Sequence, residues 1–519
     1  MTNRDGFSRR TFIKTGAAAA GALAAGRFMP LAPAVAGANN AARIGVFGGD
    51  FGNLSPMQRW DIQNGLVMYN LFDQLSGVDF ARRQIVPMLA EDWTNPDPLT
   101  WRIKLREGVR WHRGYGEVTA ADVVYTWLTH LATSSYQVGT GLFLLDSVTA
   151  EGKYVVEVKT KTPFGPFPGT VLSYGGSIVS EKAHKEMGDQ AYSARPVGNG
   201  PYMVETVRGS EIELVRNPDY WRAGHPKLER LFYRAIPDSG VRLQSLIRGE
   251  LDFITHPDPR DVAQMRQNTD FETVSTPGWN WDFQQFNLAG NPDHPFQDKR
   301  VRQAISYAID REAIVREIYG GEATPTDNQL PAGYLGHESA LLRYPVNGDL
   351  AKARELMAAS GTTGFEVEVI TSDKDWLRKE LELVAAMVSQ IGITYRIRNL
   401  DIGGFNNSWI NKNYQQHLED ITMVSPDPDA ACWWTLHSQG SLSGNNDTEL
   451  DALLDGAREL LDPAEREPLY HRITARTVEE CPTIYHCNAN YVQIFRKGLS
   501  GFQPTPQEYV QRHDATMWS

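Results

Sequence analysis

The sequence is poor in cysteine, with three in 519 residues: Cys432, Cys481 and Cys487. The odd number leaves at least one thiol unpaired within the chain. Cys481 and Cys487 could pair across a short loop in an oxidising compartment, or both could be small buried thiols.

The short motifs of common enzyme classes are also missing. The chain has no Gly-x-Ser-x-Gly elbow, no His-Glu-x-x-His helix, no P-loop and no Cys-x-x-Cys pair. Its histidines and aspartates are scattered without the spacing of a catalytic triad, although a triad can also assemble in space. We therefore expect no enzyme and no cofactor. An exported enzyme with a redox cofactor stays open as the alternative from another class.

Basic runs are absent from the body of the chain, and the formal net charge is −12. A nucleic-acid binder usually shows the opposite sign, clustered on one face. We expect no nucleic-acid partner. The charge is compatible with a cationic ligand but does not require one.

Aromatic residues, by contrast, are plentiful: 13 Trp and 20 Tyr occur in a chain too long for one hydrophobic core. The length predicts at least two lobes. Surplus aromatic side chains often line ligand pockets, although most of them pack in cores and between lobes.

The first 36 residues resemble a twin-arginine export signal. Ser8-Arg-Arg-Thr-Phe-Ile-Lys14 matches the informative positions, and Ala34-Val-Ala36 offers a small-x-small cleavage site. The weakly apolar stretch between them, residues 15–26, is too short and glycine-rich to span a membrane as a stable helix. No cysteine for a lipid anchor lies near the cleavage site. We expect a periplasmic protein that is cleaved near Ala36.

The rest of the chain alternates strand and helix patterns, which is typical of an α/β protein. Trp101–Leu105 alternates apolar and basic residues, and predicts a half-buried strand. Asp298 can cap a helix that we expect to end at Gly320-Gly321. The apolar stripe of this helix is Val301, Ala304, Ile305, Ala308 and Ile309.

An ordered set of motifs over nearly the whole mature chain resembles the bacterial extracellular solute-binding proteins of family 5, the dipeptide, oligopeptide and nickel type. The motifs are Pro87–Trp93, Trp101–His112, Thr119–Tyr125, Pro196–Tyr202, Arg216–Trp221, Gly249–Asp252, Phe296–Arg311 and Asp427–Asp429. Most of these motifs are structural. We expect Asp122, Gly200 and Asn217 to hold caps and turns.

The resemblance implies a two-lobed periplasmic binding protein, type II-like and of cluster C, with an extra subdomain inserted in the first lobe. It places lobe I at 37–282, with the insertion at about 76–195, lobe II at 283–483, and a return to lobe I at 484–519. Crossovers near 283 and 483 would join the lobes. Hinge closure around the ligand would present a bound shape to a membrane permease.

Family ligands lie against three segments, which the resemblance places here at Gly49–Asn53, Trp279–Phe283 and Met423–Trp434. The residues that it implies for ligand contact are Phe51, Asn53, Trp279, Trp281, Asp427, Asp429, Trp433 and Trp434.

The tryptophan pairs are the best clue from the sequence itself. Trp279 and Trp281 lie two apart on a predicted strand and so share a face. Trp433 and Trp434 are adjacent and cannot both face the same way. A Trp ring can stack on flat groups or attract cations, but each of these rings could instead pack in the wall of the cleft.

One position departs from the family pattern. Val424 stands where dipeptide and oligopeptide binders carry an Asp that holds the peptide ammonium. Because a buried ammonium needs a carboxylate, either Asp427 or Asp429 takes that role or the ligand is not an ordinary free-amino peptide.

The expected function is therefore the binding component of an ABC importer, a monomer that carries a peptide-like or other small polar solute to its permease. A nickel, metal-chelate or opine binder of the same family is the alternative. Only Cys481, His486 and Cys487 cluster at a spacing that could hold a soft metal, so we expect no metal site. A sensory role is also compatible with the sequence.

Overall fold

The computed structural model describes residues 40–57, 62–82, 84–133, 141–338, 343–423, 425, 427–508 and 510–519. Residues 39–519 form one compact unit. The predicted signal segment, residues 1–36, lies outside the described residues, as does Val424.

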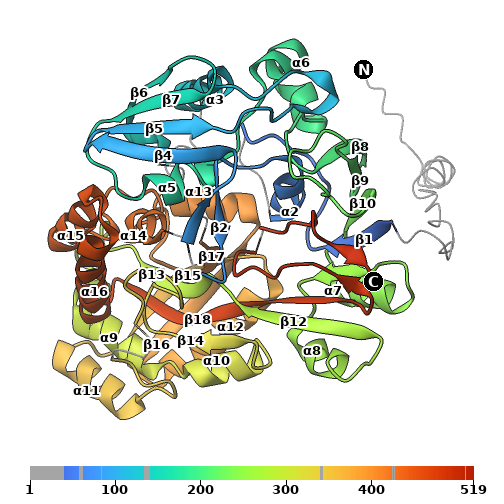
Figure 1. Cartoon of the computed structure of the whole chain (residues 1–519). Coiled ribbons are helices and arrows are strands. Elements are labelled where there is room, and N and C mark those ends of the chain that lie inside the picture. The colour runs from blue at the N-terminus through green and yellow to red at the C-terminus, as the bar shows by residue number, and fades with distance from the viewer. Residues whose placement is uncertain are drawn as a thin grey trace, which may run out of the picture. The chain divides into compact units, whose positions relative to one another are not determined.

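A mixed sheet of twelve strands runs through this unit (Figure 1). Its strands are β1 (Ala41–Val46), β8 (Tyr202–Arg208), β9 (Glu211–Arg216), β10 (Arg230–Ala235), β11 (Phe253–Thr255), β12 (Phe271–Pro277), β13 (Asn280–Phe286), β14 (Ala323–Pro325), β15 (Phe365–Ser372), β16 (Ile393–Leu400), β17 (Gln416–Thr422) and β18 (Thr483–Arg496). The order is β16-β15-β17-β13-β18-β11-β1-β10-β9-β8, and β12 and β14 also pair with β18.

Strand β18 belongs to both halves of the sheet. Its first half pairs with β13 and β14, and its second half pairs with β11 and β12. The partner changes between Ala489, opposite Ala323 of β14, and Asn490, opposite Pro277 of β12. The chain therefore passes between the two halves at 278–279 and 489–490, and the lobe boundaries near 283 and 483 stay a prediction.

The half with β1 and β8–β11 forms the first lobe, together with α2 (Ile62–Leu71), α7 (Ser239–Ile247) and α8 (Pro259–Met265). Strand β1 lies between β10 and β11 and runs parallel to both. Ala42, Ile44 and Val46 are buried at every second position of β1, as expected for a strand that packs one face on a core.

A separate antiparallel sheet forms the centre of the inserted segment, which Figure 1 shows in blue to teal at the top of the molecule. The sheet has the order β4 (Ala90–Asp97), β5 (Thr100–Leu105), β7 (Val155–Thr160) and β6 (Leu145–Ala150), and α3 (Ala120–Thr133) packs against it. The hairpin of β2 (Ser76–Asp79) and β3 (Gln84–Pro87), α5 (Phe167–Thr170) and α6 (Glu181–Ala194) complete the segment. Strand β5 confirms the predicted half-buried strand, since Trp101, Ile103 and Leu105 are buried while Arg102 and Lys104 are exposed.

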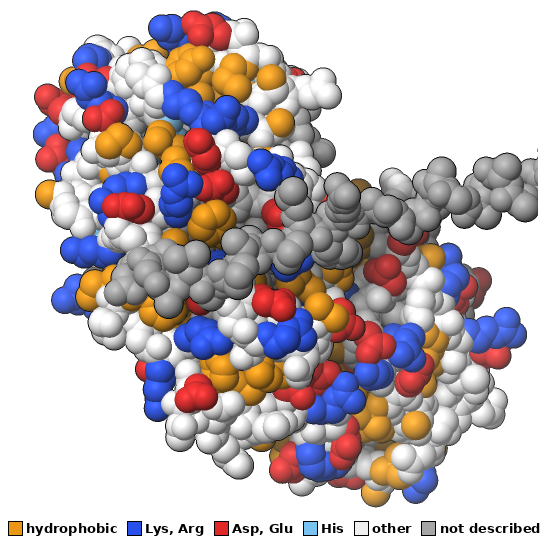
Figure 2. All heavy atoms as spheres, turned by 90° about the vertical axis from the view of Figure 1, so that its right-hand side faces the viewer, with side chains coloured by type: hydrophobic (Ala, Val, Ile, Leu, Met, Phe, Trp, Pro, Cys, Tyr) orange, Lys and Arg blue, Asp and Glu red, His pale blue; other side chains and the backbone are white. Residues whose placement is uncertain are grey.

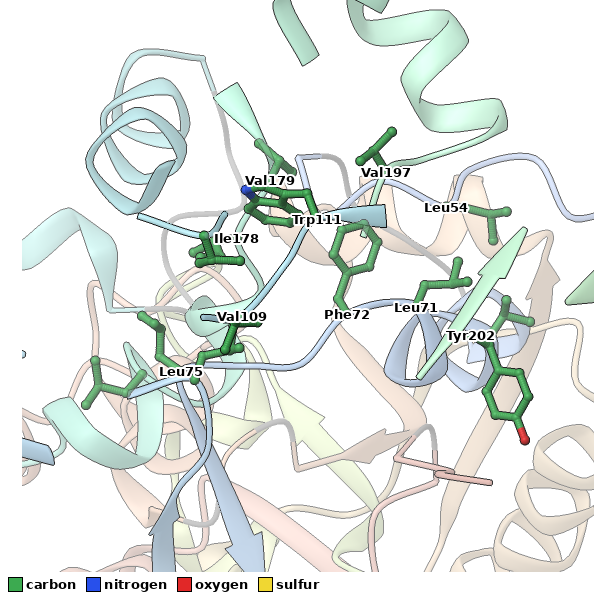
Figure 3. Close-up of a cluster of buried hydrophobic side chains, with 14 of the residues drawn as sticks. Leu54, Leu71, Phe72, Leu75, Val109, Trp111, Ile178, Val179, Val197 and Tyr202 are labelled. Atoms are coloured by element: carbon green, nitrogen blue, oxygen red, sulfur yellow. The ribbon is translucent and has the colours of Figure 1, made fainter. Parts of the chain in front are cut away.

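The inserted segment shares its hydrophobic core with the first lobe. Trp111, which lies between β5 and α3, is buried in the same cluster as Phe72 and Leu75, which follow α2. Figure 3 shows Trp111 close to Phe72, with Val179 and Val197 around them. The insertion is therefore continuous with the first lobe and does not form a core of its own.

In its described residues, the second lobe is built from β13–β17, the first half of β18 and eight helices. The helices are α9 (Lys299–Ala308), α10 (Arg311–Glu317), α11 (Leu350–Ser360), α12 (Asp375–Ser389), α13 (Ile402–Ile410), α14 (Pro428–Leu436), α15 (Thr448–Glu459) and α16 (Pro463–Glu480). Neighbouring residues of β15 enter different apolar clusters. Val369 belongs to one cluster, and Ile370 belongs to the other. Helices thus cover both faces of this half of the sheet.

Helix α9 begins where the sequence predicts, because the Asp298 side chain accepts a hydrogen bond from the Arg300 N–H. Its apolar stripe is buried as expected. The prediction that this helix continues to Gly320-Gly321 is wrong. Ile309 is extended, and Asp310 caps a second helix, α10, so one apolar pattern covers two short helices.

Candidate functional site

The candidate site lies where the carboxyl ends of strands from the two lobes meet. In open α/β sheets, ligands bind outside these ends. Phe47 follows β1 of the first lobe, and Trp376 lies in the first turn of α12, which follows β15 of the second lobe. Their ring centroids are 6.1 Å apart in an edge-on arrangement, and both side chains are partly exposed. The two edges are therefore in contact at a place that solvent still reaches.

A chain of polar contacts runs along the same boundary. The Glu508 Oε1 atom lies 2.5 Å from His256 Nε2, directly after β11, and its Oε2 accepts from the Thr422 hydroxyl at 2.9 Å, at the end of β17. The Thr422 hydroxyl also lies 3.0 Å from the Tyr491 hydroxyl, to which Asn280 Nδ2 donates at 2.9 Å. This series of polar contacts links the two lobes beside both places where the polypeptide passes from one lobe to the other.

Trp281 lies in β13, whereas Trp279, which was expected on the same strand, lies directly before its first residue, Asn280. Trp279 donates from Nε1 to the Ala332 carbonyl at 3.2 Å, and its ring meets Phe80 of the inserted segment at 5.5 Å and Tyr334 at 4.8 Å. Trp281 is fully buried, and its indole N–H has no hydrogen-bond partner within the described residues. Both rings enter the same apolar cluster.

Asp427 and Asp429 lie at the start of helix α14 and are both paired with arginine. Asp427 caps the helix, and its carboxylate accepts two hydrogen bonds from Arg466, at 2.6 and 2.7 Å. Asp429 accepts two from Arg458, both at 2.9 Å, and both of these side chains are buried. Each carboxylate is therefore already neutralised by a bidentate guanidinium.

Trp433 and Trp434 face different surroundings. The Arg458 guanidinium lies 4.3 Å from the Trp433 ring centroid, and His437 stacks on that ring at 4.7 Å. The Trp434 ring is partly exposed, although its buried indole N–H finds no partner in the described part of the chain. Of the two, Trp434 is the better placed to meet a ligand.

Phe51 and Asn53 lie in the loop after β1. Phe51 is buried in the core of the first lobe, and its N–H donates to the Gly209 carbonyl at 2.9 Å. The Asn53 side chain accepts from the Ser55 N–H at 3.0 Å and is partly exposed. Phe51 thus anchors the loop, whereas Asn53 presents a polar group near its surface.

A charged group at the second lobe's edge escapes the sequence analysis. Lys374, between β15 and α12, contacts both Glu419 at 2.7 Å and Asp420 of β17. Burial raises the pKa of Glu419 to about 8 although Lys374 opposes it. Burial also acts to raise the pKa of Asp420, but attraction to Lys374 and hydrogen bonds with Glu419 and Lys374 together keep that pKa below its usual value. Only the pairing of β15 with β17 brings these residues together, and no local pattern marks it.

The residues just before helix α14 and the end of helix α15 also contact the inserted segment of the first lobe. The Ser425 hydroxyl, just before this helix, donates to the Gly169 carbonyl at 2.6 Å, and the Gly165 N–H donates to the Arg458 carbonyl at 3.0 Å. A side chain at Gly169 would meet Asp427 Cβ at 2.9 Å. The lobes therefore touch on both sides of the boundary.

All three cysteines are free and buried, so Cys481 and Cys487 are two separate thiols. No group of three or more His, Cys, Asp or Glu side chains in the described ranges is arranged to hold a metal ion. Nor is any described helix long and apolar enough to cross a membrane.

Two α/β lobes that share crossing strands and meet at their strand ends define the class of two-lobed solute-binding proteins. The family model of bacterial extracellular solute-binding proteins, family 5 Middle, matches residues 84–443, and the chain belongs to this family.

Similar proteins span almost the same length. A glutathione-binding protein of Salmonella paratyphi A is 27% identical over 493 residues, which cover 91% of this chain and 93% of the relative. The structure of the binding protein AgaA of A. tumefaciens R10 with agropinic acid has a TM-score of 0.80 at 23% identity, covering 92% of this chain and 99% of AgaA. A dipeptide-binding protein of Pseudoalteromonas with Met-Leu also reaches 0.80 at 21% identity, covering 92% and 100%.

Proposed function

We propose that this protein is the exported substrate-binding component of an ABC importer, which captures a small solute between its lobes and delivers it to a membrane permease. The observation that carries the proposal is the meeting of two strand-end edges, where Phe47 and Trp376 offer partly exposed aromatic surface beside the polar contacts of Glu508 and Thr422. A closed boundary removes a ligand from water and strengthens each polar contact with it. Membership of family 5 supports this role.

In the proposed site, the residues expected from the sequence have one of two roles: some contact the ligand, and the others support the site. Trp434 and Asn53, which are partly exposed, offer a wall and a polar contact, and the buried side chains of Trp279, Trp281, Phe51 and Trp433 support them. Asp427 and Asp429 hold helix α14 and the loop before it, since Arg466 and Arg458 already occupy their carboxylates. The proposed ligand is accordingly not held by an ammonium contact to either residue.

The proposed solute is peptide-like or another small polar metabolite with flat or apolar parts. Relatives and similar structures carry glutathione, a dipeptide or agropinic acid in their names, which supports small polar molecules over large ones. An opine-type solute or a metal chelate is the alternative within the family.

The proposed place of action is the periplasm, reached by twin-arginine export with cleavage near Ala36. The proposed partners are the solute and the permease, and the proposed state is a monomer without nucleic acid. On the face shown in Figure 2, basic and acidic side chains are interspersed.

Native mass spectrometry of the mature protein, followed by release and identification of any retained molecule, tests this function. We expect one small molecule per chain. If none is retained, a thermal-shift panel of dipeptides, glutathione, opines and nickel–histidine complexes follows. The proposal fails if no member of this panel stabilises the protein, and a bound coloured cofactor in the visible spectrum would favour the enzyme alternative.

A further inference from the structure

The C-terminal strap, defined as residues 505–508 and 510–514, crosses the candidate site. Its Pro506 carbonyl accepts a hydrogen bond from the Trp279 N–H at 2.6 Å, and Gln507 Nε2 donates to the Met423 carbonyl at 3.1 Å. The Met423 N–H in turn donates to the Trp279 carbonyl at 2.7 Å. The strap is thus bonded to the start of β13 and to the chain just beyond β17.

The following residues of the strap are fixed in the first lobe. Asn70 of α2 donates to the Gln511 carbonyl at 2.7 Å and accepts from the His513 N–H at 2.8 Å. Arg512 forms an ion pair of 2.7 Å with the fully buried carboxylate of Asp73. The strap therefore ties the first lobe to the ligand-facing edge of the second.

Within the strap, the Glu508 carboxylate has one partner from each lobe. His256 from the first lobe lies 2.5 Å from Oε1, and Thr422 from the second donates to Oε2 at 2.9 Å. The Glu508 side chain is only 10% exposed, so water cannot readily take the place of His256 or Thr422 beside its carboxylate. Loss of either contact leaves a nearly buried carboxylate short of a partner.

The first lobe presents His256 in a fixed conformation. Its φ of 50° is rare for a residue with a side chain and persists only where the surroundings enforce it. The buried guanidinium of Arg242 supplies that enforcement, because it donates to the carbonyls of Thr255 and His256. His256 is therefore a rigid support for Glu508.

We propose that Glu508 is a positioning residue that holds the end of β17 against the first lobe and so sets the balance between joined and separated lobes. The inference rests on the proposed function, in which the separation of the lobes admits solute and their joining retains it. Removing the Glu508 carboxylate, or the Thr422 hydroxyl that it binds, shifts the molecule towards separated lobes.

Distances between spin labels test this inference without knowledge of the solute. Val241→Cys on α7 and Ile410→Cys on α13 place labels at exposed positions of the two lobes, and the three native cysteines are buried. In this background, Glu508→Ala and Thr422→Val lengthen the distance between labels, with about a tenfold change in the ratio of joined to separated molecules. Thr422→Ser keeps the hydroxyl and retains the parent distances, as does Glu467→Ala at an exposed site of α16.

Each outcome is decisive. Unchanged distances in Glu508→Ala overturn the proposal, and so does a shift in Glu508→Ala that Thr422→Val does not reproduce. Unfolding midpoints of the same samples separate a shift of the lobes from a loss of folding. Because no solute is added, a failure to find a transported solute contradicts the proposed function and leaves the result on Glu508 standing.

Discussion

Two carboxyl groups, Asp282 of β13 and Glu380 of α12, are buried side by side in the second lobe. The Tyr319 hydroxyl donates to Asp282 and lies 3.4 Å from Glu380 Oε2, while His486 Nδ1 lies 2.5 Å from Glu380 Oε1. Burial and mutual repulsion raise the pKa of Asp282 well above its usual value, and burial raises that of Glu380 to about 7. Above about pH 4.5 the folded pair therefore holds protons that the same two residues lose in the unfolded chain.

A falling stability with rising pH follows from this pair. Because the folded state binds protons that the unfolded state releases above its own pKa values, the free energy of unfolding declines as the pH rises above about 4.5, at about 1.4 kcal/mol per pH unit for each proton retained. Asp282→Asn removes one of the two titrating carboxyl groups and makes this decline shallower. Urea unfolding at pH 5, 6, 7 and 8 measures both slopes.

Charged groups around the pair are common to parent and variant, so only the difference between slopes is diagnostic. The groups that face it are Tyr319, His486, Cys487 and Asp420, and Arg311 acts in turn on His486 and Cys487. Glu355→Gln, in an exposed contact with Lys352, should keep the parent slope. Equal slopes for the parent and Asp282→Asn would contradict the retention of protons by this pair in the folded state.

Single residues differ in how well the sequence reveals them. Asp122 bonds the Thr119 N–H at 2.9 Å and Asn217 bonds the Asp219 N–H at 3.0 Å, so both roles were predictable from nearby residues. Glu508 and its partner His256 lie far apart in the sequence, and only the finished fold brings them together. Local patterns of capping carry no information on such contacts.

Helix α14 depends on ion pairs with the two helices that follow it. Asp429 and Arg458 are both buried and bidentate, so removal of either partner leaves an uncompensated charge and costs about 3–5 kcal/mol. In a double-mutant cycle of Asp429→Ala and Arg458→Ala, the two losses should therefore be strongly non-additive, with a coupling of at least about 2 kcal/mol. Urea unfolding measures the four stabilities.

The exposed pair Asp375 and Arg378, one turn apart on α12, provides the control cycle. It has the same type of charges at 2.6 Å but lies largely in solvent, so its coupling should stay below about 1 kcal/mol. A coupling of Asp429 with Arg458 no larger than this value would show that the pair does not hold α14.

Helices were easier to predict than their interruptions. The caps at Asp298 and Asp349 and the stop at Gly361 could be recognised from the sequence, since each acts within one turn. The break between α9 and α10 was missed because the buried positions continue through Ile309 while its backbone becomes extended. An apolar stripe reports burial but not the continuity of a helix.

Across the protein, two lobes share one sheet while keeping separate apolar clusters. Family motifs predicted this arrangement, whereas the pairing of β18 with strands of both lobes depends on the fold. Since few strands connect the lobes, the contacts between the lobes at their boundary determine the balance between joined and separated forms. Ligand binding shifts the same balance towards the joined form.

The ring contact of Phe47 with Trp376 makes this linkage measurable. A contact between the lobes stabilises the solute-bound form without stabilising either lobe alone, so Phe47→Ala should weaken solute binding by about tenfold and leave the urea midpoint nearly unchanged. Calorimetry with the solute identified by mass spectrometry measures the affinity. Leu99→Ala, an exposed apolar site in the inserted segment, should retain the parent affinity. If Phe47→Ala binds within about twofold of the parent, or if its loss of affinity follows a loss of stability, the boundary contact does not contribute to retention of the solute.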